Sequence, residues 1–459
     1  MDKFTTNQLE LSKINKVYFV GIGGIGMSAL ARYFLDSGKA VFGYDKTATL
    51  LTTVLESEGM VIHYEDNVSL IPAGIDLVIW TPAIKELKEL DYLKTLNVPI
   101  LKRAAVLGLI SKDKRTIAIG GTHGKTTTSS LTAHLLHVGG LENTAFLGGI
   151  AENFKSNYLK GSGDWVVVEA DEFDRSFLHL HPEIAVVTSM DADHLDIYGT
   201  DEEIKKSFNE FANLTCAGGL VFTKQDLPLT INKMGVRKAF YGVEEGEFQA
   251  LNLRYADGFS VFDFKGPGGN LSALQFTTPG RHNVENATVA IAIAQYLGVS
   301  EEKIREALKS FLGIKRRFDF LYKSETKVYI DDYAHHPTEL NATIGSAKLL
   351  FPGKKILGIF QPHLYSRTRD FQEGFASALD QLDEIILMEI YPARELPIEG
   401  VSSEIIFSKM NNLNKTLIAK EDALNAIKSA EFDVLLSLGA GDIDQLRGPI
   451  VDFLKQAEK

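Results

Sequence analysis

Short apolar runs alternate with amphipathic stretches along the first hundred residues. β-rich runs occur at 16–20, 40–45, 60–64, 76–81 and 98–101, and helical patterns such as that at 86–96 lie between them. Strands that alternate with helices form βαβ units, and such units predict a mostly parallel sheet. We therefore expect a first α/β domain over residues 1–110.

The same alternation continues through two further blocks. In the second block, strand-like runs occur at 116–120, 164–169, 183–190 and 218–223. They are followed by a less regular stretch typical of β-hairpins at 248–280 and by helical patterns at 283–299 and 301–313. In the third block, strand patterns alternate with helices at 327–333, 355–360, 384–391 and 433–439. We predict an α/β protein of three domains, over residues 1–110, 111–314 and 315–459.

Composition and charge exclude several classes of protein. The 459 residues carry a net charge of −12, so no nucleic-acid partner is expected, because phosphate binding needs a basic surface. No apolar run approaches the roughly 20 residues of a membrane span, and the N-terminus has no apolar core of a secretory signal. The single cysteine, Cys216, cannot form an internal disulfide, which favours a cytoplasmic protein. We expect Cys216 to be a small buried residue rather than a nucleophile.

The stretch VYFVGIGGIGMSAL at 17–30 is an apolar strand that runs into a Gly-x-Gly-x-x-Gly loop and a helix. This is the dinucleotide fingerprint in its proper setting, and Asp45 stands nineteen residues after Gly26, where an NAD enzyme would place a ribose-binding carboxylate. The physical signal is broader, because a tight turn, a bare backbone and a helix N-terminus accept any diphosphate, including UDP. With UDP, Asp45 is either a uridine-side contact or only a strand-end carboxylate. The candidate diphosphate-binding residues are Gly21, Gly23, Gly24 and Gly26.

The stretch IAIGGTHGKTTT at 117–128 is a second strand, glycine loop and helix start, and it carries a lysine. It is a variant of the phosphate-binding P-loop, because Ile119 stands where the strict pattern has glycine. Lys125 can reach the β- and γ-phosphates of a triphosphate, and the Thr126 hydroxyl can bind Mg²⁺. We expect ATP to bind at Gly121, Thr122, His123, Gly124, Lys125, Thr126 and Thr127.

Acidic residues follow two strands of the second block. Glu169 ends the run WVVVE and begins an acidic segment, and the next strand leads to DADHLD, which contains His194. Carboxylates at the ends of parallel strands point into the crevice where ligands bind, and Mg²⁺ prefers oxygen ligands. Hydride transfer needs neither a lysine loop nor a metal cluster. The second block therefore indicates that a substrate is phosphorylated or joined at the expense of ATP.

Nine stretches together resemble one known family, the Mur ligases of bacterial peptidoglycan synthesis. They occur in the order GIGGIGMSALA, GTHGKTTT, EADEFDRSF, DADHLD, GRHNVENATVAIA, KRRFD, DDYAHHPTE, FQPHLYSRT and GAGDI. The resemblance implies a Rossmann-like UDP-sugar-binding domain, a central P-loop ATPase-type domain, and a Rossmann-like C-terminal domain for the amino acid and nucleotide. It also implies ATP-dependent ligation of L-alanine to the lactoyl carboxylate of UDP-N-acetylmuramate through an acyl phosphate.

The resemblance also assigns roles to individual residues. Thr126, Glu169 and His194 would hold Mg²⁺. Asn286 would contact adenine, unless it is an ordinary helix-face residue, and Arg317, Asp331 or Asp332, and Tyr333 would face the nucleotide. His335 and Arg367 would lie near the reacting carboxylate and L-alanine, with His335 a candidate to orient or deprotonate the ammonium, although metal or solvent could serve instead. The implied catalytic set is Lys125, His194, His335 and Arg367.

Three alternatives stay open from the sequence. A recycling ligase that attaches a whole tripeptide to the same UDP-sugar shares most of these motifs. An NAD-dependent oxidoreductase rests only on the first glycine loop, and a non-catalytic nucleotide-binding protein is a third possibility.

Several relatives carry a carbamylated lysine as an extra metal bridge, but the equivalent position here is near Asn209, so we predict none. We expect a cytoplasmic monomer or homodimer without a membrane span.

Overall fold

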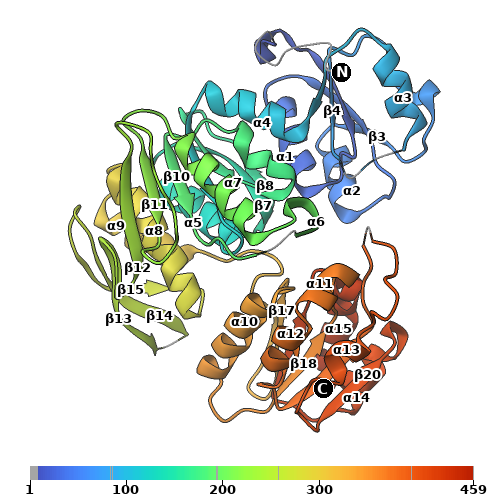
Figure 1. Cartoon of the computed structure of the whole chain (residues 1–459), viewed down its shortest axis with the longest axis vertical. Coiled ribbons are helices and arrows are strands. Elements are labelled where there is room, and N and C mark those ends of the chain that lie inside the picture. The colour runs from blue at the N-terminus through green and yellow to red at the C-terminus, as the bar shows by residue number, and fades with distance from the viewer. Residues whose placement is uncertain are drawn as a thin grey trace. The chain divides into compact units, whose positions relative to one another are not determined.

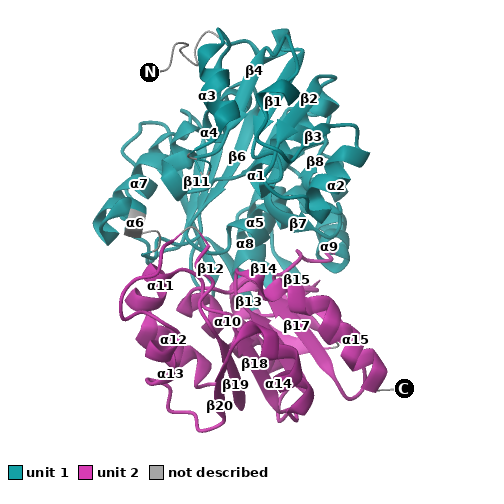
Figure 2. Cartoon of the chain, turned by 90° about the vertical axis from the view of Figure 1, so that its right-hand side faces the viewer, with its two compact units in different colours: residues 1–251, 263–272, 285–310 teal, residues 252–262, 273–284, 311–459 magenta. Residues whose placement is uncertain are grey.

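The computed structural model describes residues 9–82, 84, 86–192, 195–256, 258–393 and 395–457. The chain divides into two compact units, which Figure 2 colours teal and magenta. Unit 1 comprises Met1–Leu251, Asp263–Ser272 and Glu285–Ser310, and unit 2 comprises Asn252–Phe262, Ala273–Val284 and Phe311–Lys459.

The first sheet of unit 1 is parallel throughout and has the strand order β3-β2-β1-β4-β5. Its strands are β1 (Lys16–Val20), β2 (Ala40–Tyr44), β3 (Val61–His63), β4 (Leu77–Trp80) and β5 (Ile100–Lys102). The helices between and after them are α1 (Ile25–Asp36), α2 (Leu50–Ser57), α3 (Lys88–Thr95) and α4 (Arg103–Lys112). Val17 and Phe19 pack in one core with α1, whereas Tyr18 and Val20 pack in another with α3. Because strand side chains alternate between faces, a strand covered by helices on both sides is apolar throughout.

The second sheet of unit 1 contains the order β12-β11-β10-β6-β9-β7-β8. Its strands are β6 (Arg115–Gly120), β7 (Thr144–Ala151), β8 (Ser156–Leu159), β9 (Trp165–Glu169), β10 (Ile184–Val187), β11 (Leu220–Thr223) and β12 (Arg237–Val243). Its helical elements include α5 (Lys125–Val138), η4 (Phe173–His179), α6 (Leu195–Tyr198), α7 (Asp201–Asn213) and α9 (Glu301–Ser310). Strands β10, β6 and β9 are mutually parallel, so their carboxyl ends share one edge of the sheet. Figure 1 shows β10, β11 and β12 of the same sheet side by side. Four elements contribute residues to both units, namely β13 (Phe248–Ala256), β14 (Phe259–Lys265), β15 (Leu271–Phe276) and α8 (Arg281–Tyr296).

A buried asparagine on β8 of the second sheet forms hydrogen bonds with helix α1, which packs on the first sheet of unit 1. The Asn157 amide donates to Ser28 Oγ at 3.0 Å and to the carbonyl of Ile25, and its oxygen accepts from Arg32 Nη1 at 2.5 Å. Ser28 and Ile25 lie in the first turn of α1, directly after the first glycine loop. One continuous apolar core also joins α1 to strands of the second sheet. The first glycine loop therefore has a fixed position relative to the second sheet.

Unit 2 is built around a sheet of strand order β16-β17-β21-β18-β19-β20, in which β16 is antiparallel to β17 and the other pairs are parallel. Its strands are β16 (Asp319–Lys323), β17 (Val328–Asp332), β18 (Ile356–Phe360), β19 (Glu384–Met388), β20 (Lys415–Ile418) and β21 (Val434–Leu438). Its helices are α10 (Pro337–Leu350), α11 (Tyr365–Asp370), α12 (Gln372–Leu379), α13 (Glu404–Phe407), α14 (Ala423–Ser429) and α15 (Arg447–Ala457). Separate apolar cores cover the two faces, which confirms a second doubly wound sheet.

The three sheets confirm the predicted α/β class, while the boundaries at residues 110 and 314 stay predictions. The expectation for Cys216 is wrong: this cysteine is exposed, because it lies in the turn between α7 and β11 rather than on the buried face of the helix. Among the described helices, none is long and apolar enough to cross a membrane.

Candidate active site

The first glycine loop joins β1 to α1 and is closed by Asp45. Gly21 has φ +88°, a conformation that favours glycine, and α1 begins after Gly24 without a side-chain cap. The Asp45 carboxylate follows β2 and accepts from the backbone N–H of Gly23 at 2.7 Å. That amide is therefore directed at Asp45. The uncapped first turn of α1 remains the part of this loop that suits an anion.

An arginine that the sequence analysis missed lies against the same helix start. A Cβ placed on Gly26 would lie 3.0 Å from both Cδ and Nη1 of Arg103. Arg103 Nη2 in turn donates to the Asp171 carboxylate at 2.9 Å. The signal in the sequence was the basic pair at 102–103 directly after a predicted strand, since strand ends of this sheet meet at one edge.

The second glycine loop joins β6 to α5, and two of its glycines have no room for a side chain. Gly121 has φ +140°, and a Cβ there would lie 2.0 Å from Thr188 Oγ1. Gly124 has φ +82°, and a Cβ there would lie 2.7 Å from the amide oxygen of Asn286. Helix α5 begins at Lys125 without a side-chain cap. The structure thus brings Asn286, the predicted adenine contact, beside an uncapped helix start that fits phosphate.

The polar residues of this loop attach it to the end of β10. Thr122 Oγ1 donates to the carbonyl of Asp191 at 2.9 Å, and the His123 N–H donates to Ser189 Oγ at 2.8 Å. His123 Nε2 also lies 3.3 Å from the Asp191 carboxylate. These contacts position the loop, whereas Thr126 and Thr127 lie in the first turn of α5.

Lys125 is surrounded by acceptors. Its ammonium donates to the carbonyls of Gly121 at 2.6 Å and Thr122 at 3.1 Å, and to Glu172 Oε1 at 2.9 Å. Burial disfavours the charge of Lys125, but the carboxylates of Glu172, Glu169 and Asp171 outweigh it and raise the pKa of Lys125 above its usual value. The lysine is therefore a fixed positive charge at the head of α5.

Glu169 ends β9 beside the same helix. Its Oε2 accepts from the Gly148 N–H at 3.0 Å and lies 3.5 Å from Ser129 Oγ, and a Cβ on Gly148 would lie 1.9 Å from Oε1. The glycine thus makes room for the carboxylate. Thr126 and Glu169 supply the oxygen donors that Mg²⁺ prefers, and so fit such an ion. His194 lies outside the described residues. Within the described ranges, no group of three or more His, Cys, Asp or Glu side chains is placed to hold a metal.

The acidic segment after β9 divides among three cations. Glu172 pairs with Lys125, Asp171 with Arg103, and Asp174 Oδ2 accepts from Lys102 Nζ at 2.8 Å. From the sequence, only Glu169 of this region was expected to bind Mg²⁺, and the residues after it had no individual role. The backbone turns sharply here, with φ +54° at Asp174 and φ +53° at Arg175, so consecutive side chains point in different directions.

In unit 2, the two aspartates at the end of β17 hold the surrounding turns. Asp332 accepts from the backbone N–H groups of Phe318 at 2.7 Å and Ala334 at 2.8 Å. Burial raises the pKa of Asp332 to about 6, although nearby Arg317 favours the charged form. Asp331 is fully buried and lies 3.4 Å from Arg316 Nε, with Ser437 donating to it at 2.6 Å. Both carboxylates are thus engaged within unit 2.

The segment after β17 brings together the other predicted residues of unit 2. The guanidinium of Arg317 lies 5.2 Å from the centre of the Tyr333 ring. His335 Nδ1 lies 2.9 Å from the carbonyl oxygen of Tyr333 and 3.1 Å from the Glu339 carboxylate, two acceptors that place the proton on Nδ1. Nε2 is then the basic nitrogen of the neutral ring.

His335 and Arg367 come together around a third side chain. The rings of His335 and His363 are 6.0 Å apart, and His363 Nδ1 lies 3.3 Å from Arg367 Nη1. Arg367 is only 5% exposed. His363 and Glu339 had no predicted role of their own, although they stand inside the stretches FQPHLYSRT and DDYAHHPTE.

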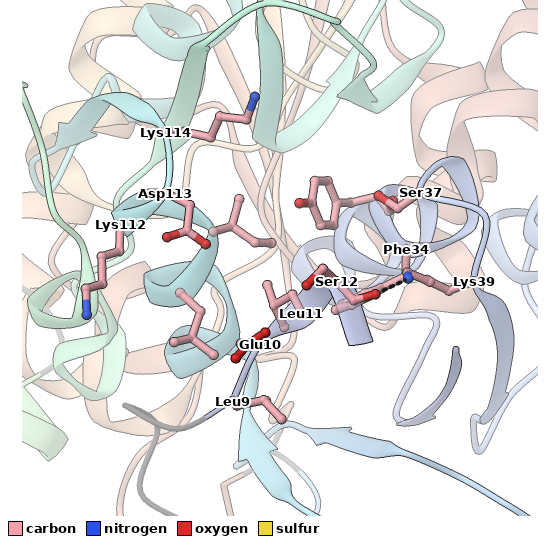
Figure 3. A pocket seen from close by; sticks show the side chains of 13 residues that line it. Leu9, Glu10, Leu11, Ser12, Phe34, Ser37, Lys39, Lys112, Asp113 and Lys114 are labelled. Atoms are coloured by element: carbon pink, nitrogen blue, oxygen red, sulfur yellow. Dashed lines mark hydrogen bonds between the residues drawn. The ribbon is translucent and has the colours of Figure 1, made fainter. Parts of the chain in front are cut away.

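A cavity of about 590 Å³ lies elsewhere in unit 1. It is lined by residues 9–12, by the end of α1, by Lys39, by residues 109–110 and by residues 112–114 (Figure 3). Lys39 Nζ donates to the Ser12 carbonyl at 3.0 Å at its rim. The predicted site residues do not line it. This cavity is therefore at the end of α1 opposite the first glycine loop and is not part of the candidate site.

Three family models match successive parts of the chain. A model described as Mur ligase family, catalytic domain, matches residues 16–115. The Mur ligase middle domain matches 119–294, and the Mur ligase glutamate ligase domain matches 316–441. The chain belongs to the Mur ligase family.

Individual relatives within that family share one activity in their names. The chain is 51% identical to the UDP-N-acetylmuramate–L-alanine ligase of Flavobacterium johnsoniae, covering 98% of this chain and 100% of that one. It is 49% identical to the enzyme of that name from Parabacteroides distasonis, covering 98% and 100%. The crystal structure of UDP-N-acetylmuramate–alanine ligase MurC from Thermotoga maritima matches with a TM-score of 0.81 at 31% identity, covering 96% and 99%.

Proposed function

We propose that this chain joins L-alanine to the lactoyl carboxylate of UDP-N-acetylmuramate at the expense of ATP, an amide-forming step of peptidoglycan precursor synthesis. The relatives named above support the substrate pair. The observation that carries the chemistry is Lys125, held at the uncapped start of α5 with the Glu169 carboxylate nearby. We also infer that the reaction takes place in the cytoplasm and that the enzyme works as a monomer or homodimer.

The first step makes the carboxylate reactive. A carboxylate is a poor electrophile, because attack would add negative charge to an anion. In the proposal, its oxygen attacks the γ-phosphoryl group of ATP, the bond to the β-phosphate oxygen breaks, and an acyl phosphate and ADP form. Lys125 and the N–H groups at the head of α5 offset the charge that spreads over the transferred phosphoryl oxygens. Thr126, Glu169 and His194 would hold Mg²⁺, which when bound supplies further positive charge at the phosphates.

The second step forms the amide. The neutral amine of L-alanine attacks the acyl carbon, and the C–O bond to phosphate breaks. His335 can take the ammonium proton at Nε2, because Tyr333 and Glu339 fix its other nitrogen as a donor. The guanidinium of Arg367 suits the alanine carboxylate, which it can bind through two parallel hydrogen bonds.

The remaining predicted residues bind the two nucleotides. Asn286 would contact adenine beside Gly124, and Arg317 and Tyr333 would contribute a stacked cation and ring. Asp332 would not touch the nucleotide but would position Arg317 and Tyr333, because it accepts from the N–H groups of Phe318 and Ala334 beside them. The first glycine loop would receive the diphosphate of the UDP-sugar at the start of α1, where Gly21, Gly23, Gly24 and Gly26 leave the backbone bare.

Phosphate release with UDP-N-acetylmuramate and ATP across a panel of amines tests the proposal. We expect release with L-alanine to exceed release with glycine, L-serine or the recycled tripeptide. Faster release with the tripeptide would assign the chain to the recycling ligases instead. Absence of release with every amine, together with measurable ATP binding, would reduce it to a nucleotide-binding protein.

A further inference from the structure

A buried carboxylate outside the predicted site holds the phosphate-loop lysine. Glu172 is 4% exposed, and its two oxygens lie 2.9 Å and 2.8 Å from Lys125 Nζ. The backbone of Glu172 is itself fixed, because Tyr198 donates its hydroxyl to the Glu172 carbonyl at 2.6 Å. The acidic side chain therefore reaches the loop from a separate, anchored segment.

The three N–H bonds of the Lys125 ammonium all point at acceptors of this chain. Two acceptors are the carbonyls of Gly121 and Thr122. These belong to the loop, whose shape is set by the positive φ of Gly121 and by the Thr188 hydroxyl, which lies within hydrogen-bond distance of the Gly120 and His123 carbonyls. A phosphate oxygen can bind Lys125 directly only if one acceptor leaves. Glu172 is the acceptor on a separate segment, and a carboxylate oxygen and a phosphate oxygen are acceptors of the same kind.

We propose that Glu172 is a positioning residue that occupies the phosphate's place on Lys125 in the nucleotide-free enzyme, and that the γ-phosphate of ATP replaces it. This inference rests on the proposed function. Before binding, Glu172 compensates the buried charge of Lys125 and holds its side chain across the loop. The same carboxylate repels an approaching anion and therefore weakens nucleotide binding, while it keeps the Lys125 side chain in position.

Titration calorimetry with ATP, without UDP-sugar or alanine, compares the wild type with Glu172→Gln, which keeps the shape and removes the charge. We expect ATP to bind at least about fivefold more tightly to the variant, because a carboxylate next to the phosphate site is gone. ADP lacks the γ-phosphate and should gain less. Asp174→Asn is the matched control: it removes the same charge from the same segment, but Asp174 pairs with Lys102 and is 37% exposed. Its ATP affinity should stay within about twofold of wild type.

Thermal unfolding separates this role from a merely structural one. Without nucleotide, Glu172→Gln should have a lower melting temperature than wild type, because Lys125 loses its buried partner. With saturating ATP, the two melting temperatures should become equal. An equal loss with and without ATP would overturn the proposal, as would unchanged or weaker ATP binding. If the single variant does not fold, the double variant Lys125→Met, Glu172→Gln should, because both charges are removed; a double variant that also fails would contradict the pairing. Failure of the wild type to bind ATP would instead contradict the proposed function.

Discussion

Unit 1 contains two strand–glycine-loop–helix elements that have the same backbone plan and opposite electrostatic character. Both loops bend at glycines with positive φ, Gly21 and Gly121, and both lead into helices without side-chain caps. In the first loop, Asp45 turns inward and accepts from the Gly23 N–H, and the nearby Arg103 is paired with Asp171. In the second loop, the charged residue is Lys125, which is held by Glu172.

A glycine loop and the charged side chains around it make different contributions. The glycines and the helix N-terminus provide a place for a diphosphate, whichever molecule carries it. Lys125, and Glu169 at the end of the neighbouring strand β9, add the charges that phosphoryl transfer needs. In our account, the first loop only binds its substrate, whereas the second takes part in the chemistry.

The largest effect should follow from removing the lysine of the second loop. We expect Lys125→Met to lower kcat for ligation by about a thousandfold or more, because the transferred charge loses its fixed cation. UDP-N-acetylmuramate should still bind within about twofold of wild type, since the first loop is untouched. Phosphate release and calorimetry measure the two quantities. Lys160→Met, at an exposed ion pair with Asp36, is the matched control. Ligation by Lys125→Met within tenfold of wild type would remove the distinction between the loops.

Adding one methyl group to either loop should weaken binding of that loop's own ligand and leave binding of the other ligand unchanged. Gly124→Ala places a Cβ 2.7 Å from Asn286 at a positive φ of 82°, so we expect KM for ATP to rise by about tenfold. Gly21→Ala, at φ +88°, should raise KM for UDP-N-acetylmuramate by a similar factor. Steady-state kinetics with each substrate varied in turn gives both values. If either variant affects both substrates equally, the assignment of one ligand to each loop is wrong.

A smaller effect should follow at the carboxylate that closes the first loop. Asp45→Asn weakens the bond to the Gly23 N–H by about 1 kcal/mol, because a charge-assisted hydrogen bond becomes a neutral one. KM for the UDP-sugar should rise about fivefold while KM for ATP stays unchanged. Asp36→Asn, at the end of α1 and paired with Lys160, serves as control. A shift in the ATP value alone would show that Asp45 acts elsewhere.

Much of the fold and part of the site could be predicted from sequence. The strands that lead into the two glycine loops are apolar because they are covered on both faces, and Lys125 follows from its place after Gly124. The partners of the acidic residues could not be predicted. Glu172 and Asp174 are two positions apart, yet sharp backbone turns direct one to Lys125 and the other to Lys102.

The direction of a side chain at a strand end could not be predicted from the sequence either. Asp45 and Asp332 both stand at the places where a ligand-binding carboxylate was expected. In the structure, both accept from backbone N–H groups of neighbouring loops. Spacing along the chain locates such residues at the right edge of a sheet, but only the path of the following loop decides which donor they meet.

A last effect concerns the helices behind the two loops at low pH, and it changes stability rather than ligand binding or catalysis. Helix α1 carries a buried Arg32, whereas α5 carries His134, whose pKa burial lowers to about 4. Below about pH 6.5, the unfolded chain takes up a proton on this histidine that the folded protein does not. Stability is therefore lost as pH falls from 6.5 to 4, by up to about 3 kcal/mol. Melting temperatures at pH 7.5 and pH 5 should differ less for His134→Gln than for wild type, and an equal difference would contradict the prediction.

The central claim is that the second loop directs the γ-phosphoryl group onto the substrate carboxylate. It is tested most directly with UDP-N-acetylmuramate that carries ¹⁸O in the lactoyl carboxylate, in a complete reaction with ATP and L-alanine. When the amine displaces phosphate from the acyl phosphate, one carboxylate oxygen leaves with it, so ³¹P NMR should find ¹⁸O in the inorganic phosphate. Unlabelled phosphate, or label in AMP, would contradict the account.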